Sequence, residues 1–238
     1  MKAVSAWFMG LAKSNMMIQY GPHDKMCNLI CEDHYMLFVL SRFGIPMGFG
    51  DSDIEEVCKR NGVDVKTFLA IVNMNLHGEG TLPKVDKDLH PEAIVKYLHN
   101  SHDYFLDYRL PSIRARLMEA MDGERDVAVV VMRYFDEYVA EVRKHMEYEE
   151  KVVFPYIRAL VEGDSGDDYH ISIFRKQHSD IESRLTELRD ILIKYYTGKT
   201  GHVFNAVLFD IFTCADDLRQ HNTVEDCLLV PLIELLEK

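Results

Sequence analysis

The chain has 238 residues, 47% of them hydrophobic, so it can bury a sizeable core in one large or two small domains. A formal net charge of −12 argues against nucleic-acid binding, because contact with phosphates needs a basic face. The five cysteines follow no regular framework, and no apolar run approaches the roughly 20 residues of a membrane helix. We therefore expect a cytoplasmic protein with reduced thiols and no membrane contact.

The first part of the chain, residues 1–77, predicts a small N-terminal helical domain. Ser52-Asp-Ile-Glu55 has the spacing of a capping box and predicts the start of a short helix, which Asn61-Gly62 would end. A second helix is expected from Val65 to Met74. Cys27 and Cys31 lie one helical turn apart, and the sequence leaves open whether they form a redox pair or are incidental thiols.

Residues 78–90 contain two glycines, a proline and five charged residues, which is typical of a linker. Beyond them, residues 91–238 predict an up-down four-helix bundle, and no segment has a convincing strand pattern. The fold class expected is therefore all-α. The bundle helices are predicted at 91–120, 124–160, 169–196 and from 202 onward. Pro91 suits a first helical position, whereas Pro111, Pro155 and Pro231 should bend or break their helices.

The two halves of the predicted bundle repeat each other at an offset of 76 residues. Apolar positions follow the same register: Val131, Phe135 and Val142 recur as Val207, Ile211 and Leu218. The ligand-type residues that repeat are His102 as His178, His145 as His221, and Glu149 as Glu225. The register predicts two copies of one helical hairpin, each with a His on its first helix and His-x-x-x-Glu on its second.

The spacing of His145 and Glu149 indicates metal chemistry. Residues four apart lie on one helix face, and this face is otherwise apolar, so an unpaired charge there would be costly. Four antiparallel helices would bring four His and two Glu to one core. Two metals would share these residues equally, if each metal takes two His and both Glu bridge the pair. This arrangement would leave room for a bridging oxygen. The alternative is a set of core histidines with ordinary hydrogen-bond partners.

Imidazole and carboxylate ligands without thiolate suit iron or manganese better than structural zinc. The stretches from His145 to Pro155 and from His221 to Pro231 resemble the hemerythrin-like (HHE cation-binding) domains, over roughly residues 90–238. The resemblance implies two non-haem iron ions, bridged by an oxo or hydroxo group, inside a four-helix bundle. Manganese or zinc would be a less usual occupant.

Within that superfamily, the chain is most similar to the di-iron proteins implicated in repair of iron–sulfur clusters. The segment Leu40-Ser-Arg-Phe-Gly-Ile45 resembles the N-terminal domain of that group. The group carries adjacent cysteines after this segment, whereas Gly48-Phe49 stands at the corresponding place here. A repair step that uses the protein's own thiols is therefore not expected.

Two further assignments depend on the register. His99 lies one turn before His102 and is an alternative ligand, but its counterpart at the 76-residue offset is Arg175, so we predict His102. Glu141 and Asp217 lie four residues before His145 and His221. They are candidates to accept the second ring N–H of these histidines or to relay protons, unless they are ordinary surface acids.

Three functions follow from such a centre. The first is redox chemistry in oxidative or nitrosative stress, including repair of iron–sulfur clusters with an iron–sulfur protein or an electron donor as partner. The second is a module that binds or senses oxygen or nitric oxide. The third is iron handling. The sequence leaves open whether the protein is an enzyme and whether it forms a homodimer.

Overall fold

The computed structural model describes residues 19–77, 85, 87–121, 125–163, 169–177, 181–198 and 201–238. Within these ranges the chain is helical, and its only strand-like feature is an isolated bridge between Lys25 and Asp53. The all-α prediction is confirmed. Most of the predicted linker, residues 78–84 and 86, lies outside the described residues. No helix in the described ranges is long and apolar enough to cross a membrane.

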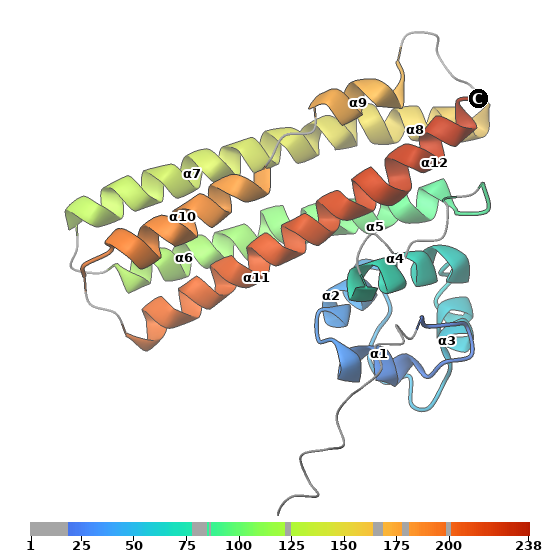
Figure 1. The fold of residues 1–238 in the computed structure, drawn as a ribbon, viewed down its shortest axis with the longest axis horizontal. Helices are drawn as coiled ribbons and strands as arrows, with labels where there is room; N and C mark the ends of the chain where they lie inside the picture. The colour runs from blue at the N-terminus through green and yellow to red at the C-terminus, as the bar shows by residue number, and fades with distance from the viewer. Residues whose placement is uncertain are drawn as a thin grey trace, which may run out of the picture.

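The helices of the bundle are arranged as four rods, and Figure 1 shows that the rods run lengthwise beside one another. The first rod is α5 (Pro91–Asp103), η2 (Tyr104–Arg109) and α6 (Leu110–Ala120), and the second is α7 (Arg125–Tyr148), η3 (Glu149–Val153) and α8 (Phe154–Glu162). The third is α9 (Ile171–Gln177) and α10 (Ile181–Tyr195), and the fourth is α11 (His202–Val224), η4 (Glu225–Leu229) and α12 (Val230–Leu236). Consecutive rods are neighbours, and α11 closes the bundle against α6.

Each proline predicted to bend a bundle helix follows a π-helical turn. Pro111, Pro155 and Pro231 stand at the start of α6, α8 and α12, directly after η2, η3 and η4. A proline lacks the backbone N–H that an α-helix needs, and its ring clashes with the preceding turn. A π-helical turn widens the helix by one residue there, so the rods continue. Because η3 and η4 lie 76 residues apart, the repeat extends to the backbone conformation.

The N-terminal unit contains α1 (Met26–Glu32), α2 (Met36–Arg42), α3 (Ile54–Arg60) and α4 (Val65–His77). The predicted capping box is shifted by one residue, because the side chain of Asp53 rather than Ser52 accepts from the backbone of Glu56. The end predicted for α3 is confirmed, with Gly62 at a φ of 66° that favours glycine. Sequence reasoning did not place α1 and α2, which are seven residues long and have no side-chain cap.

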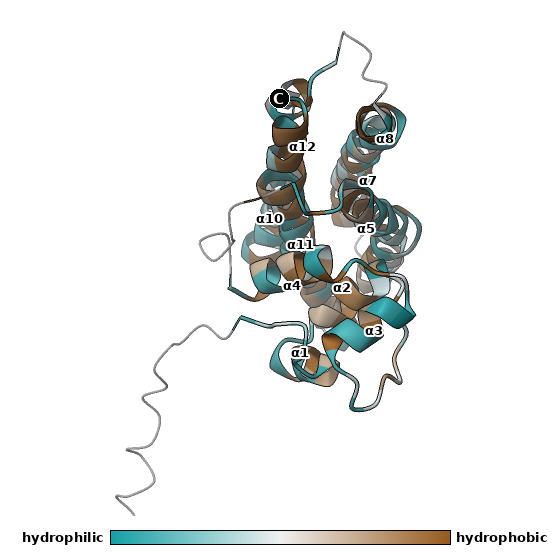
Figure 2. Ribbon diagram, turned by 90° about the vertical axis from the view of Figure 1, so that its right-hand side faces the viewer, coloured by the Kyte–Doolittle hydropathy of each residue, from teal (hydrophilic) through white to brown (hydrophobic). Residues whose placement is uncertain are grey.

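Two apolar clusters fill the molecule. One joins the N-terminal unit to one end of the bundle, through residues of α2, α4, α5, α8 and α12. The other fills the opposite end, between α6, α7, α10 and α11. Figure 2 shows α2 and α4 lying on the side of the N-terminal unit that faces the bundle. The two parts of the chain therefore share one core at their junction, and a layer of buried polar residues lies between the two clusters.

Candidate metal centre

Four buried side chains from three rods converge between the two apolar clusters. They are His102 from α5, Glu149 from η3, His221 from α11 and Glu225 from η4. One ligand atom of each lies within 4.8 Å of the others, and each residue is at most 2% exposed. Burying carboxylates in this way is costly unless a cation or donors compensate them.

The nitrogen–oxygen contacts within this cluster are short. His102 Nε2 lies 2.8 Å from Glu149 Oε2, and His145 Nε2 lies 2.6 Å from Glu149 Oε1. His221 Nε2 lies 2.9 Å from Glu225 Oε1. Among the described residues, Nε2 of His102 and of His221 and both Glu149 oxygens have no hydrogen-bond partner. Imidazole nitrogens and carboxylate oxygens that converge this closely in a buried layer are arranged as a metal ion requires, so these residues fit a cation.

The π-helical turns explain how the carboxylates reach this position. Glu149 and Glu225 are the first residues of η3 and η4. A π-helical turn places residues four and five apart on the same face, and Glu149, Val153 and Phe154 are all fully buried. The turn therefore directs a glutamate and the apolar residues after it toward the core. Such single turns occur frequently at functional sites.

Three phenylalanines enclose the histidines. The Phe154 ring stacks on His102 at a centroid distance of 5.5 Å, and the Phe105 ring meets His221 edge-on at 5.8 Å. Phe174 stacks on His145 at 6.3 Å. These rings fix the imidazole orientations and keep bulk water from the carboxylates.

Glu150 supports His102, a role that the sequence analysis missed. His102 Nδ1 lies 2.7 Å from Glu150 Oε1, and His99 Nδ1 lies 2.9 Å from the same oxygen. Burial opposes the charged form of His102, but its contacts with Glu149 and Glu150 outweigh this and raise its pKa to about 9. A signal for this contact was present in the sequence, since the acidic residue after each candidate ligand glutamate also repeats at the 76-residue offset, as Glu150 and Asp226.

The remaining predicted residues occupy distinct places. His99 is 46% exposed, contacts Glu150 through Nδ1 and is not part of the cluster. Glu141 is 54% exposed and contacts Arg184, as an ordinary surface acid would. Asp217 is buried, but it pairs with Arg42 and does not accept from His221, whose Nδ1 has no partner among the described residues. The acceptor role predicted for Asp217 is therefore wrong. His178 lies outside the described residues.

The fold and the site together define a helical-bundle protein with a buried His and Glu group suited to a metal ion. The family model of the hemerythrin HHE cation-binding domain matches residues 93–233, which is more than half of the chain. The chain belongs to this family. No curated protein matches it significantly.

Proposed function

We propose that this protein holds two non-haem iron ions and uses them to react with oxygen or nitric oxide in the redox chemistry of oxidative or nitrosative stress. The observation that supports this most directly is the convergence of His102, Glu149, His221 and Glu225 within 4.8 Å in a buried layer. His145, which contacts Glu149, would join them. The sequence register adds His178 and completes three residues from each hairpin.

The charge of the site supports a metal cation, and the number of two ions rests on the four His and two Glu of the register. Two buried glutamates contribute two negative charges, which a bound cation would compensate. With both glutamates as bridges, each ion would have four protein ligands, fewer than the six that octahedral iron can take. An oxygen bridge and one small exogenous ligand would then fit at each ion. The absence of thiolate from the ligand set favours iron or manganese over structural zinc.

When bound, the iron would supply electron transfer and an open coordination position. The protein's own residues prepare the site for that chemistry. Glu150 accepts the Nδ1–H of His102, which directs Nε2 toward Glu149. The rings of Phe105, Phe154 and Phe174 limit the access of water and favour a small ligand such as oxygen, nitric oxide or azide.

Repair of iron–sulfur clusters by this chemistry would use electrons from an external donor. At the place of the family's adjacent cysteines, Gly48 has a φ of 92°, a conformation that strains any other residue. Burial raises the pKa of Cys58 to about 12, so its thiol stays protonated at neutral pH. Among the described cysteines, Cys31 is the one whose side chain is exposed.

Metal analysis and an optical spectrum of anaerobically purified protein test this proposal. We expect about two irons per chain and a clear spectral change when the reduced protein meets oxygen or nitric oxide. Glu149→Gln should lose most of the iron. Glu147→Gln is the matched control, because Glu147 lies on the same rod, is 46% exposed and pairs with Lys151. Full iron content in Glu149→Gln, or a wild-type protein that binds no iron, would contradict the di-iron proposal.

A further inference from the structure

A buried ion pair connects the N-terminal unit to the bundle. Arg42, the last residue of α2, is 3% exposed, and Asp217 in α11 is 1% exposed. The two nitrogens Nη1 and Nη2 of Arg42 lie 2.8 Å and 2.7 Å from the two carboxylate oxygens of Asp217. The contact is thus bidentate and joins residues 175 positions apart. A guanidinium fork fixes both the distance and the orientation of a carboxylate.

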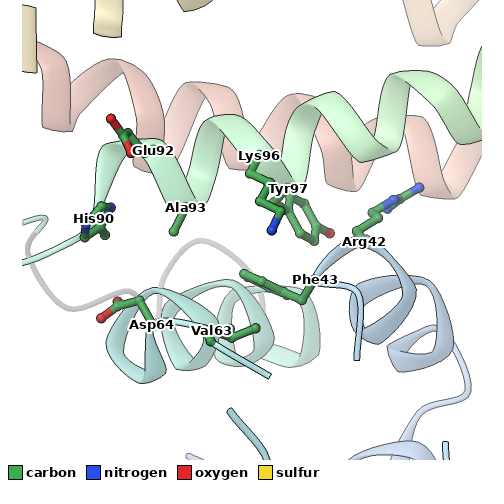
Figure 3. Close-up of a pocket in the computed structure, with 10 residues that line it drawn as sticks. Arg42, Phe43, Val63, Asp64, His90, Glu92, Ala93, Lys96 and Tyr97 are labelled. Atoms are coloured by element: carbon green, nitrogen blue, oxygen red, sulfur yellow. The ribbon is translucent and has the colours of Figure 1, made fainter. Parts of the chain in front are cut away.

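The surroundings of Arg42 hold its side chain in one place. Its Cζ lies 5.2–5.9 Å from the centroids of four aromatic rings, those of Phe38, Tyr97, Tyr104 and Phe105. The amide of Asn100 donates to its backbone carbonyl at 2.6 Å. Figure 3 shows Arg42 extending from α2 toward the bundle, at the edge of a pocket of about 210 Å³ between α5 and the N-terminal unit.

Each of these contacts lies next to the metal centre. Asp217 precedes His221 by four residues, one turn along the same face of α11. Phe105 contacts both Arg42 and His221. The centroid of its ring lies 5.2 Å from the Arg42 guanidinium, and the ring meets His221 edge-on at 5.8 Å. Asn100 lies two residues before His102 on α5. Arg42 therefore contacts the neighbours of two metal-ligand histidines that belong to different rods.

We propose that Arg42 is a positioning residue for the metal centre, through which the N-terminal unit fixes His221 by way of Asp217 and Phe105. This inference rests on the proposed metal centre. A buried ion pair contributes little net stability compared with apolar residues of similar volume, so its geometric constraint is what distinguishes it here. Because coupling between two sites is reciprocal, metal binding should in turn make the packing of α2 against the bundle more rigid.

The experiment compares the full-length wild type with the double variant Arg42→Met/Asp217→Leu, which replaces the ion pair by apolar residues and leaves no unpaired charge. Circular dichroism and thermal unfolding of the metal-free proteins establish that each is folded. The readouts are the rate of iron loss to a chelator, the optical spectrum of the azide adduct, and amide hydrogen exchange in α2 with and without iron. Arg42→Lys, which keeps the charge but lacks the fork, is measured alongside.

We expect the double variant to fold and to lose iron about 10-fold or more faster than the wild type, the scale on which outer partners of metal ligands act. Its azide spectrum should shift, and iron should no longer slow exchange in α2. Arg42→Lys should show the same changes in weaker form. The matched control is Arg109→Met, which breaks another ion pair on α11, with Asp210, 11 residues before His221. It should keep the wild-type rate and spectrum.

A double variant that matches the wild type in iron loss, spectrum and exchange would overturn the positioning role. If the double variant does not fold, the same three measurements on Arg42→Lys decide: values equal to those of the wild type would overturn the positioning role. A wild-type protein without iron would instead contradict the proposed function, and the two failures are thereby distinguished.

Discussion

Replacement of Glu150 by alanine tests whether a carboxylate outside the ligand cluster supports the metal. The variant removes the acceptor that lies 2.7 Å from His102 Nδ1, while the cluster atoms of His102 and Glu149 remain. His102 would lose the contact that selects its tautomer and the direction of its Nε2. We expect the affinity for iron to fall without loss of the fold, because the Glu150 side chain is 30% exposed.

The magnitude follows from the geometry of the contact. A hydrogen bond to a charged group contributes about 1.5–3 kcal/mol, and partial exposure of the acceptor favours the lower part of that range. At about 1.4 kcal/mol for each factor of ten, the affinity should fall by roughly 10-fold. This agrees with the about 10–100-fold effect typical of residues that orient metal ligands. Glu150→Gln keeps an acceptor oxygen without the charge and should lose less.

The assay is an anaerobic competition for ferrous iron with a chromogenic chelator. His99→Ala is the control, since it removes the other partner of Glu150 at 2.9 Å and leaves the contact with His102. It should retain nearly full affinity. If Glu150→Ala binds iron as tightly as the wild type while His102→Ala does not, Glu150 does not support the ligand and the reasoning is refuted.

Other outcomes can be measured with the same protein. His102→Ala should disrupt the centre while His99→Ala leaves iron content nearly intact, and metal analysis that ranks them in the opposite order would contradict the ligand assignment. Phe154→Ala should lower the free energy of unfolding by about 3–5 kcal/mol in a denaturant titration, because the ring is fully buried and stacks on His102. A loss below about 1 kcal/mol would contradict the packing described here. A triple variant that removes three thiols should react with oxygen or nitric oxide much as the wild type does, as measured by stopped-flow absorbance. A triple variant that keeps its iron but no longer reacts would show that a thiol takes part. The substitutions are Cys27→Ser, Cys31→Ser and Cys58→Ala.

Helical periodicity and the 76-residue register allowed the bundle rods to be predicted from the sequence. Both are local properties: apolar spacing shows which face of a helix is buried, and a His four residues before a Glu lies on the same face in any helix. The boundaries of α5 to α8 and of α11 to α12 accordingly lie close to the predicted ones. The choice of His102 over His99 as a ligand rests on this register and stays a prediction, although His102 is buried in the cluster and His99 is 46% exposed.

Short helices were harder to predict. Each of α1 and α2 spans only seven residues and has no side-chain cap, so neither periodicity nor an end signal marks it. The π-helical turns were recognised only as sites of proline strain. Whether a helix bends at a proline or forms a π-helical turn before it depends on what that part of the helix packs against. Here the π-helical turn brings Glu149 and Phe154 into the same buried layer.

The sequence by itself determined which residue types recur on the buried faces, since the register of His145 and Glu149 with His221 and Glu225 is a property of the chain. Only the tertiary structure decided their partners. Asp217 looked like a support for His221 because it lies one turn away, but its carboxylate turns to Arg42, which is 175 residues distant. A buried carboxylate takes the donor that compensates its charge most fully, and the guanidinium fork reaches Asp217 only after α2 has packed against the bundle.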